Sequence, residues 1–175
     1  IEKIWRRIYS RGFSQRPDIT LMGVLSGLEI ACWDIMGKAT DRPVYDLLGG
    51  RLHHKLRSYS YIYPPENTDS AQFYNSPDLS AETASHYLKE GFTALKFDPA
   101  GAYTILDPHM PELEDIHRSE QFLKRLREVT GTQADLLFGT HGQFSVAGAR
   151  RMAAMMEKYD PLWFEEPTPP ERPEM

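Results

Sequence analysis

Cysteine and long apolar runs are what this sequence of 175 residues has least of. The single cysteine, Cys32, has no partner for a disulfide within the chain, so a reducing, cytoplasmic location is the default expectation. No uninterrupted apolar run approaches the roughly 18 residues that cross a bilayer, and no charged leader with a cleavage site opens the chain. We therefore expect no membrane span and no secretion signal.

The sequence also has fewer basic than acidic residues. Twenty lysines and arginines stand against 25 acidic residues, a net charge of −5, so no basic face favours nucleic acid as a partner. The hydrophobic share of 41% and the charged share of 26% are ordinary for a globular chain with a real core. Because the chain starts inside an expected helix and stops after a proline-rich turn, we expect it to be truncated at both ends.

Residues 1–55 carry helical patterns only. Apolar residues recur at intervals of three and four from Leu21 to Ile35, with Thr20 as the expected N-cap and Gly37 near the C-terminal end. Shorter helices are expected over residues 1–9 and 43–48, and a loop over residues 12–18. This first part should contain no strand.

Strand and helix patterns alternate from residue 56 onward, which favours parallel βαβ units. Strands are expected over residues 57–63, 93–98, 135–138 and 162–165, and helices over 80–90, 114–130 and 145–159. An open doubly wound sheet would show G-x-G-x-x-G after its first strand, and this sequence has none. We therefore predict an α/β fold in which residues 56–175 form the first half of a TIM-type barrel, which normally takes about 250 residues.

The second expected strand ends in Lys96 and Asp98. Side chains alternate along a strand, so these two residues face one way while Leu95 and Phe97 face the other. Helices outside the barrel would cover the apolar pair and leave the charged pair inside. Either a stabilising salt bridge or a functional site accounts for such a pair.

The two following strand ends are polar as well. His141 stands in a turn between glycines that let the backbone approach a ligand, although a structural histidine fits the same pattern. Glu165 and Glu166 follow three large apolar residues, where carboxylates are costly unless they are compensated. A hard divalent cation is one compensation, and solvent before the proline turn is the other.

Together these motifs resemble the mandelate racemase branch of the enolase superfamily. The resemblance rests on K-x-D at Lys96, on F-E-E-P around Glu165, and on the helix and exit stretches Ser26–Lys38 and Pro43–Gly50. It implies the helical part of an α+β capping domain in residues 1–55, followed by the barrel. It also implies Mg²⁺ held by acidic residues, removal of the proton next to a substrate carboxylate, a symmetric homo-oligomer and a small-molecule carboxylate as partner.

The resemblance also assigns site residues. Glu165 matches the second metal ligand, and Lys96 matches the lysine that faces the substrate carboxylate. The first ligand is normally an aspartate 26 residues before that glutamate, and this position is Gly139 here. Asp98 stands in place of a second lysine, the usual racemase base. Asp98 or His141 as a replacement ligand, a water, or the absence of a metal are the alternatives for the site at Gly139.

Asp98 should keep Lys96 protonated, which makes the lysine an electrostatic clamp rather than a base. Asp98 itself is a weak base at an ordinary pKa near 4. His141 is then the best-placed proton carrier, and in galactonate-dehydratase-like enzymes a histidine at the matching position helps hydroxide leave. The catalytic candidates are therefore Lys96, Asp98 and His141.

The sequence thus predicts a dehydratase of aldonate-type acid sugars. A racemase, epimerase or cycloisomerase of the same superfamily, or a binding barrel that has lost its metal site, are the alternatives. The loop of residues 99–113 should overhang the barrel mouth, where Tyr103, His109 and also Gln143 are candidate contacts to substrate hydroxyls.

Overall fold

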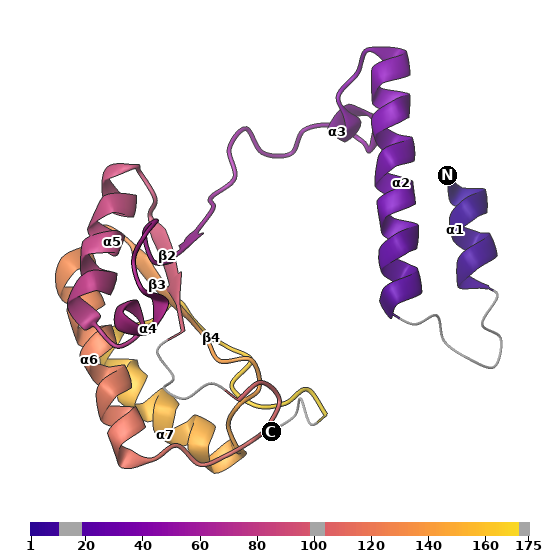
Figure 1. The fold of residues 1–175 in the computed structure, drawn as a ribbon. Coiled ribbons are helices and arrows are strands. Elements are labelled where there is room, and N and C mark those ends of the chain that lie inside the picture. Colours follow the sequence, from indigo (N-terminus) through magenta and orange to yellow (C-terminus); the bar gives the residue numbers. More distant parts are fainter. Residues whose placement is uncertain (11–18, 99–103, 172–175) are drawn as a thin grey trace. The chain divides into compact units, whose positions relative to one another are not determined.

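The computed structural model describes residues 1–10, 19–98 and 104–171, and its chain divides into two compact units, Ile1–Leu56 and Arg57–Met175 (Figure 1). The first unit contains α1 (Glu2–Tyr9), α2 (Ile19–Thr40) and α3 (Val44–Leu47), and its described residues form no strand, as predicted. The loop expected over residues 12–18 lies outside the described residues, which resume at Ile19.

The long helix α2 differs from its prediction at both ends. It contains Thr20 instead of being capped by it, and it runs three residues beyond Gly37. The glycine allows the chain that follows to fold back, because a Cβ at Gly37 would lie only 2.8 Å from the carbonyl oxygen of Arg42. Gly37 therefore allows the backbone of Arg42 to pack closely against the last turns of α2, and it does not end the helix.

By length and composition alone, α2 could cross a membrane, and the expectation of no membrane span stays a prediction. Its 22 residues include a window with a mean hydropathy of 1.5. Glycines, Ser26 and Glu29 interrupt its apolar residues, so the sequence contains no long uninterrupted apolar run there. Apolar side chains such as Val24 and Ile30 are exposed along α2, so its stability depends on contacts other than those that the described part of this unit supplies.

The second unit is a parallel four-stranded sheet with helices between the strands. Its elements are β1 (Ser60–Tyr61), α4 (Ser70–Phe73), α5 (Pro77–Lys89), β2 (Ala94–Phe97), α6 (Leu113–Thr130), β3 (Asp135–Gly139), α7 (Val146–Met156), the 3₁₀ helix η1 (Glu157–Tyr159) and β4 (Trp163–Glu165). The strands lie in the order β1-β2-β3-β4, each paired with the next along the chain. This consecutive order is that of a barrel segment, and the predicted α/β barrel class is confirmed.

Local capping explains where several of these elements begin. Ser76 accepts a hydrogen bond from the backbone N–H of Leu79, and Pro77 follows it, so α5 starts three residues before the expected position. Asp69 caps α4 in the same way, a short helix that the sequence pattern did not indicate. The first strand is much shorter than residues 57–63, because only Ser60 and Tyr61 pair with β2.

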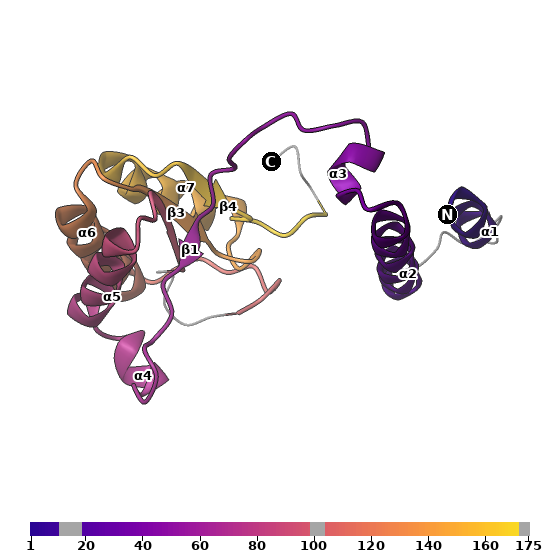
Figure 2. The ribbon, with the colours of Figure 1, turned by 90° about the horizontal axis from the view of Figure 1, so that it is seen from above.

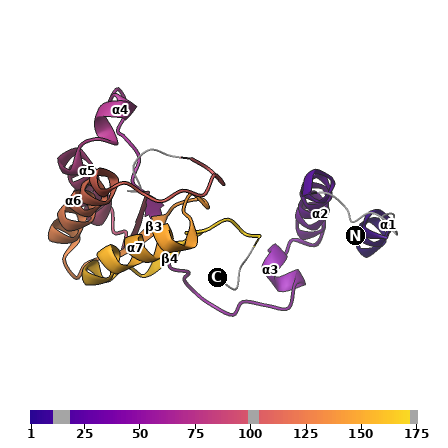
Figure 3. The same cartoon turned by 90° about the horizontal axis from the view of Figure 1, so that it is seen from below.

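The core lies between the sheet and the helices α5, α6 and α7, which gather on one side of the strands (Figures 2 and 3). Leu95 and Phe97 of β2 are fully buried there, together with Phe138 of the neighbouring strand. The alternation along β2 therefore places Lys96 and Asp98 on the opposite face of the sheet, as predicted.

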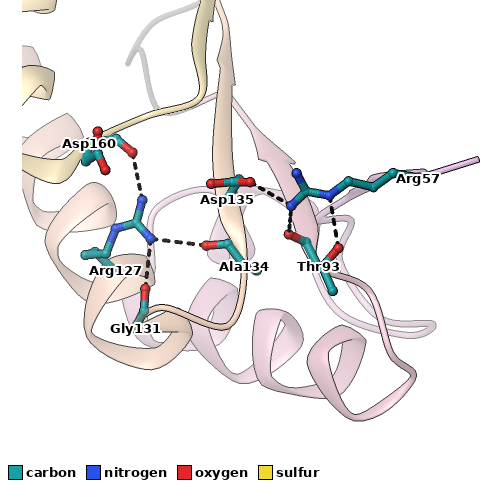
Figure 4. Close-up of polar contacts among 7 residues, drawn as sticks. All are labelled: Arg57, Thr93, Arg127, Gly131, Ala134, Asp135 and Asp160. Atoms are coloured by element: carbon teal, nitrogen blue, oxygen red, sulfur yellow. Dashed lines mark hydrogen bonds and ion pairs between the residues drawn. The ribbon is translucent and has the colours of Figure 1, made fainter.

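Two arginines hydrogen-bond to the loops that precede the strands (Figure 4). Arg127 of α6 donates to four backbone carbonyls, which belong to Gly131, Ala134, Tyr159 and Asp160, at 2.9 to 3.1 Å. Its guanidinium thereby joins the turn before β3 to the turn before β4. Arg57 similarly donates to the carbonyl and hydroxyl of Thr93 and to the carboxylate of Asp135.

We expect Arg127→Ala to lower the free energy of unfolding by about 2–5 kcal/mol, because hydrogen bonds from a charged donor are lost and partly buried carbonyls are left unpaired. Urea unfolding followed by circular dichroism measures the change. Arg125→Ala is the matched control: the same helix carries this arginine, but its ion pairs with Asp78 and Glu128 are exposed and should matter little. Equal losses in the two variants would contradict the role given to Arg127.

Candidate functional site

The strand register brings the predicted site residues to one edge of the sheet. Phe97 pairs with Phe138, and Gly139 pairs with Glu165 one position further along. Asp98 follows Phe97 and accepts a hydrogen bond from the backbone N–H of Gly139 at 3.1 Å. Asp98, Gly139 and Glu165 thus form one row across β2, β3 and β4, at the carboxyl ends where parallel barrels hold their active sites.

Lys96 reaches across this row to Glu165. Its Nζ donates to Oε1 of Glu165 at 2.5 Å, although β3 stands between their two strands. Burial lowers the pKa of Lys96, but the hydrogen bond and charge of Glu165, together with Asp98, raise the pKa above its ordinary value. The lysine is therefore a fixed ammonium at neutral pH, as the sequence predicted, although its partner is Glu165 in addition to Asp98.

Gly139 provides the space that this arrangement needs. A Cβ at position 139 would lie 2.7 Å from Oδ1 of Asp98 and 3.0 Å from Cε of Lys96. The side chains of Asp98 and Lys96 therefore occupy the volume that the Cβ of any other residue at position 139 would need. The position where the superfamily pattern has an aspartate is filled here by groups from the neighbouring strand.

Asp98 is the most enclosed carboxylate of the site, with 10% of its side chain exposed. Its Oδ2 lies 3.5 Å from Nδ1 of His141. Burial raises the pKa of Asp98, while His141, Lys96 and the N–H of Gly139 lower it, and the net shift is upward. The carboxylate is thus held in an environment that is less favourable to its charge than water.

His141 is presented by a tight turn after β3. Its φ of +50° is unusual for a residue with a side chain, and Gly142 follows with a φ of +71°. Thr140 fixes the start of this turn, because its backbone N–H and its hydroxyl both donate to the carbonyl of Glu165. The turn is therefore joined to β4, and it directs the imidazole toward Asp98.

Tyr61 of β1 is a site residue that the sequence analysis missed. Burial, and then the negative charge of Asp98, raise the pKa of its phenol, so the hydroxyl stays protonated. Tyr61 pairs with Lys96 in the strand register and therefore lies in the layer below Asp98. The alternation of aromatic residues in this segment predicted a strand, but nothing in the pattern distinguished Tyr61 from its neighbours.

The loop before α6 lies along the turn that carries His141. Leu106 donates its backbone N–H to the carbonyl of His141, and His109 donates to that of Gln143. The side chain of His109 hydrogen-bonds to Thr104, and Gln143 is fully buried, so the structure gives both residues a place within the loop framework. Tyr103 lies outside the described residues.

The residues that could hold a divalent cation do not form a complete site. Within residues 1–10, 19–98 and 104–171, no group of three or more histidine, cysteine, aspartate or glutamate side chains is arranged to hold a metal ion. Glu165 is a suitable ligand, but Lys96 neutralises it, and Gly139 offers no side-chain oxygen. The described donor set therefore does not fit Mg²⁺ by itself.

Comparison with known proteins agrees with this fold. The family described as enolase C-terminal domain-like matches residues 79–175. The D-gluconate/D-galactonate dehydratase of Picrophilus torridus is 32% identical over 98% of this chain, and the D-xylonate dehydratase of Haloferax volcanii is 32% identical over 86%. The chain spans 41% and 36% of these two curated relatives, which is about two fifths of their length.

Crystal structures of mandelate racemase/muconate lactonizing enzymes are more similar still. The protein from Sulfitobacter sp. is 54% identical with a TM-score of 0.89, and the protein from Jannaschia sp. CCS1 is 55% identical with a TM-score of 0.87. They match 97% and 95% of this chain, which covers 44% and 43% of theirs. The chain belongs to the enolase superfamily, in its mandelate racemase/muconate lactonizing enzyme branch, and it resembles the acid-sugar dehydratases of that branch.

The buried charge of Asp98 leads to a prediction about stability. Because the pKa of Asp98 is raised in the folded state, its ionised form opposes folding above that pKa, and the cost disappears as the pH falls below the ordinary value. We therefore expect Asp98→Asn to raise the melting temperature at neutral pH, with a gain that shrinks as the pH is lowered. Calorimetry across this range measures it, and a lower melting temperature for the variant at pH 7 would show that the partners of Asp98 outweigh its burial.

Proposed function

We propose that this chain forms part of a dehydratase that acts on acid sugars of the aldonate type. The observation that carries the proposal is the convergence of Lys96, Asp98, His141 and Glu165 from three successive strand ends. The names of the relatives, which are dehydratases of gluconate, galactonate and xylonate, support the substrate class.

The reaction assigned to the site removes water from two neighbouring carbons. A base takes the proton on the carbon next to the carboxylate, and the electron pair of that bond forms an ene-diolate. The C–O bond on the next carbon then breaks, and the departing hydroxide accepts a proton and leaves as water. The enol that remains rearranges to a 2-oxo acid.

Lys96 is assigned to the substrate carboxylate. An ammonium has three donors, and the structure commits one of them to Glu165. A fixed positive charge with only 12% of its side chain exposed is a strong partner for the negative charge that grows on the carboxylate oxygens. The base that takes the first proton belongs, by the superfamily resemblance, to a later strand of the barrel.

His141 is assigned the second proton transfer, to the departing hydroxide. Histidine is the side chain that most often transfers protons in enzymes, and the ring of this one lies 3.5 Å from the carboxylate of Asp98. Its location in the turn after β3, on the same edge as Lys96, is compatible with one substrate contacting both residues.

A binding barrel without catalysis is the second candidate, and Gly139 is the observation that favours it. A hard-cation site that lacks one carboxylate is weakened. In that case the ammonium of Lys96 would hold a carboxylate ligand without any chemistry that follows.

We expect His141→Asn in the full-length protein to reduce the turnover of an acid sugar by about 10²–10⁴-fold, with the melting temperature nearly unchanged. Incubation with a panel of aldonates, followed by detection of 2-oxo acids, measures the turnover. His109→Asn is the matched control, because His109 belongs to the loop framework and should tolerate the change. Full activity in His141→Asn would remove this residue from the mechanism.

The same panel in deuterium oxide separates the candidate functions. A dehydratase forms 2-oxo acids. A racemase or epimerase exchanges the proton next to the carboxylate for deuterium and forms no 2-oxo acid. Binding of an aldonate with neither product would favour the binding barrel and end the proposal of a dehydratase.

A further inference from the structure

We infer that Gly139 and Asp98 form one coupled unit: the glycine leaves the space in which the Asp98 carboxylate sits, and from there the carboxylate positions His141. The catalytic importance of this unit rests on the role proposed for His141. The packing of Asp98 against Gly139 and its contact with His141 do not depend on that role. The inference assigns Asp98 as a positioning residue rather than as the base or the metal ligand that the sequence left open.

The first step is steric. Oδ1 of Asp98 lies 2.7 Å from the point where a Cβ of residue 139 would be, a distance that real Cβ atoms essentially never show. The second neighbour, Cε of Lys96 at 3.0 Å, belongs to a flexible side chain and can move more easily. Any residue other than glycine at this position must therefore displace the carboxylate first.

The second step concerns the two oxygens of Asp98. Oδ1 accepts a hydrogen bond from the backbone N–H of Gly139 at 3.1 Å, which fixes the plane of the carboxylate against β3. Oδ2 then lies 3.5 Å from Nδ1 of His141. The glycine thus acts twice, once through the space it leaves and once through the N–H that it donates.

The third step concerns the tautomer of His141. A carboxylate beside Nδ1 favours the form in which Nδ1 carries the proton, which makes Nε2 the nitrogen that exchanges protons with a substrate. The contact of 3.5 Å is longer than a good hydrogen bond, as catalytic hydrogen bonds often are in structures without substrate. His141 has a φ of +50°, and in this backbone conformation its imidazole lies beside Asp98.

A set of four variants of the full-length protein tests the steric coupling. Gly139→Ala should lower the melting temperature when Asp98 is present, and it should have little effect when Asp98→Ala has removed the carboxylate. Asp98→Asn is the matched variant that keeps the volume and removes the charge, so Gly139→Ala should remain destabilising beside it. Equal effects of Gly139→Ala in all three backgrounds would overturn the coupling.

The tautomer is tested by ¹⁵N NMR of the protein with labelled histidine. The wild-type His141 should show the neutral form protonated on Nδ1, and Asp98→Ala should shift this residue toward the other tautomer. His109 is an internal control in the same spectra, because its Nδ1 contacts Thr104 and not Asp98. An unchanged tautomer of His141 in a folded Asp98→Ala variant would overturn the positioning role.

These two measurements need no substrate. A protein that shows the coupling and the tautomer shift, yet turns over no acid sugar, would contradict the proposed function and leave the inference intact. A protein that dehydrates acid sugars but shows neither the coupling nor the tautomer shift would overturn the inference and leave the proposed function intact.

Discussion

The site depends on the parallel, in-register pairing of β2, β3 and β4. Because residues that pair across a parallel sheet face the same side, this register sets Asp98, Gly139 and Glu165 in one row at the carboxyl ends of the strands. The same register directs Leu95, Phe97 and their neighbours into the apolar layer under the helices. A shift of one residue in β2 would exchange the two sets and bury both charged side chains in that layer.

The absence of a side chain on Gly139 leaves room for the ion pair between Lys96 and Glu165. Lys96 crosses β3 to reach Glu165 past a residue that has no Cβ. The ammonium pairs with Glu165 and is also attracted by the charge of Asp98, so it offsets part of the cost of burying these carboxylates. A glycine in a strand usually weakens it, but here it permits an interaction across three strands.

Much of this architecture could be predicted from the sequence. The alternation of apolar residues predicted β2, and the polar residues at or just after the ends of β2, β3 and β4 predicted which edge of the sheet carries the candidate site. The extent of β1 could not be predicted, because it depends on which residues pair with β2 and not on the alternating pattern of residues 57–63. The roles of Gly139 and Tyr61 were hidden for a related reason: both depend on which residues of other strands lie beside them.

The most direct test of the account is a crystal structure of the full-length protein with a bound hydroxy acid that cannot lose water, such as tartronate. The account predicts that one carboxylate of the ligand lies about 3 Å from Nζ of Lys96, with His141 on the same ligand and its Nδ1 toward Asp98. A ligand bound elsewhere, or Lys96 and His141 found on separate surfaces, would contradict it.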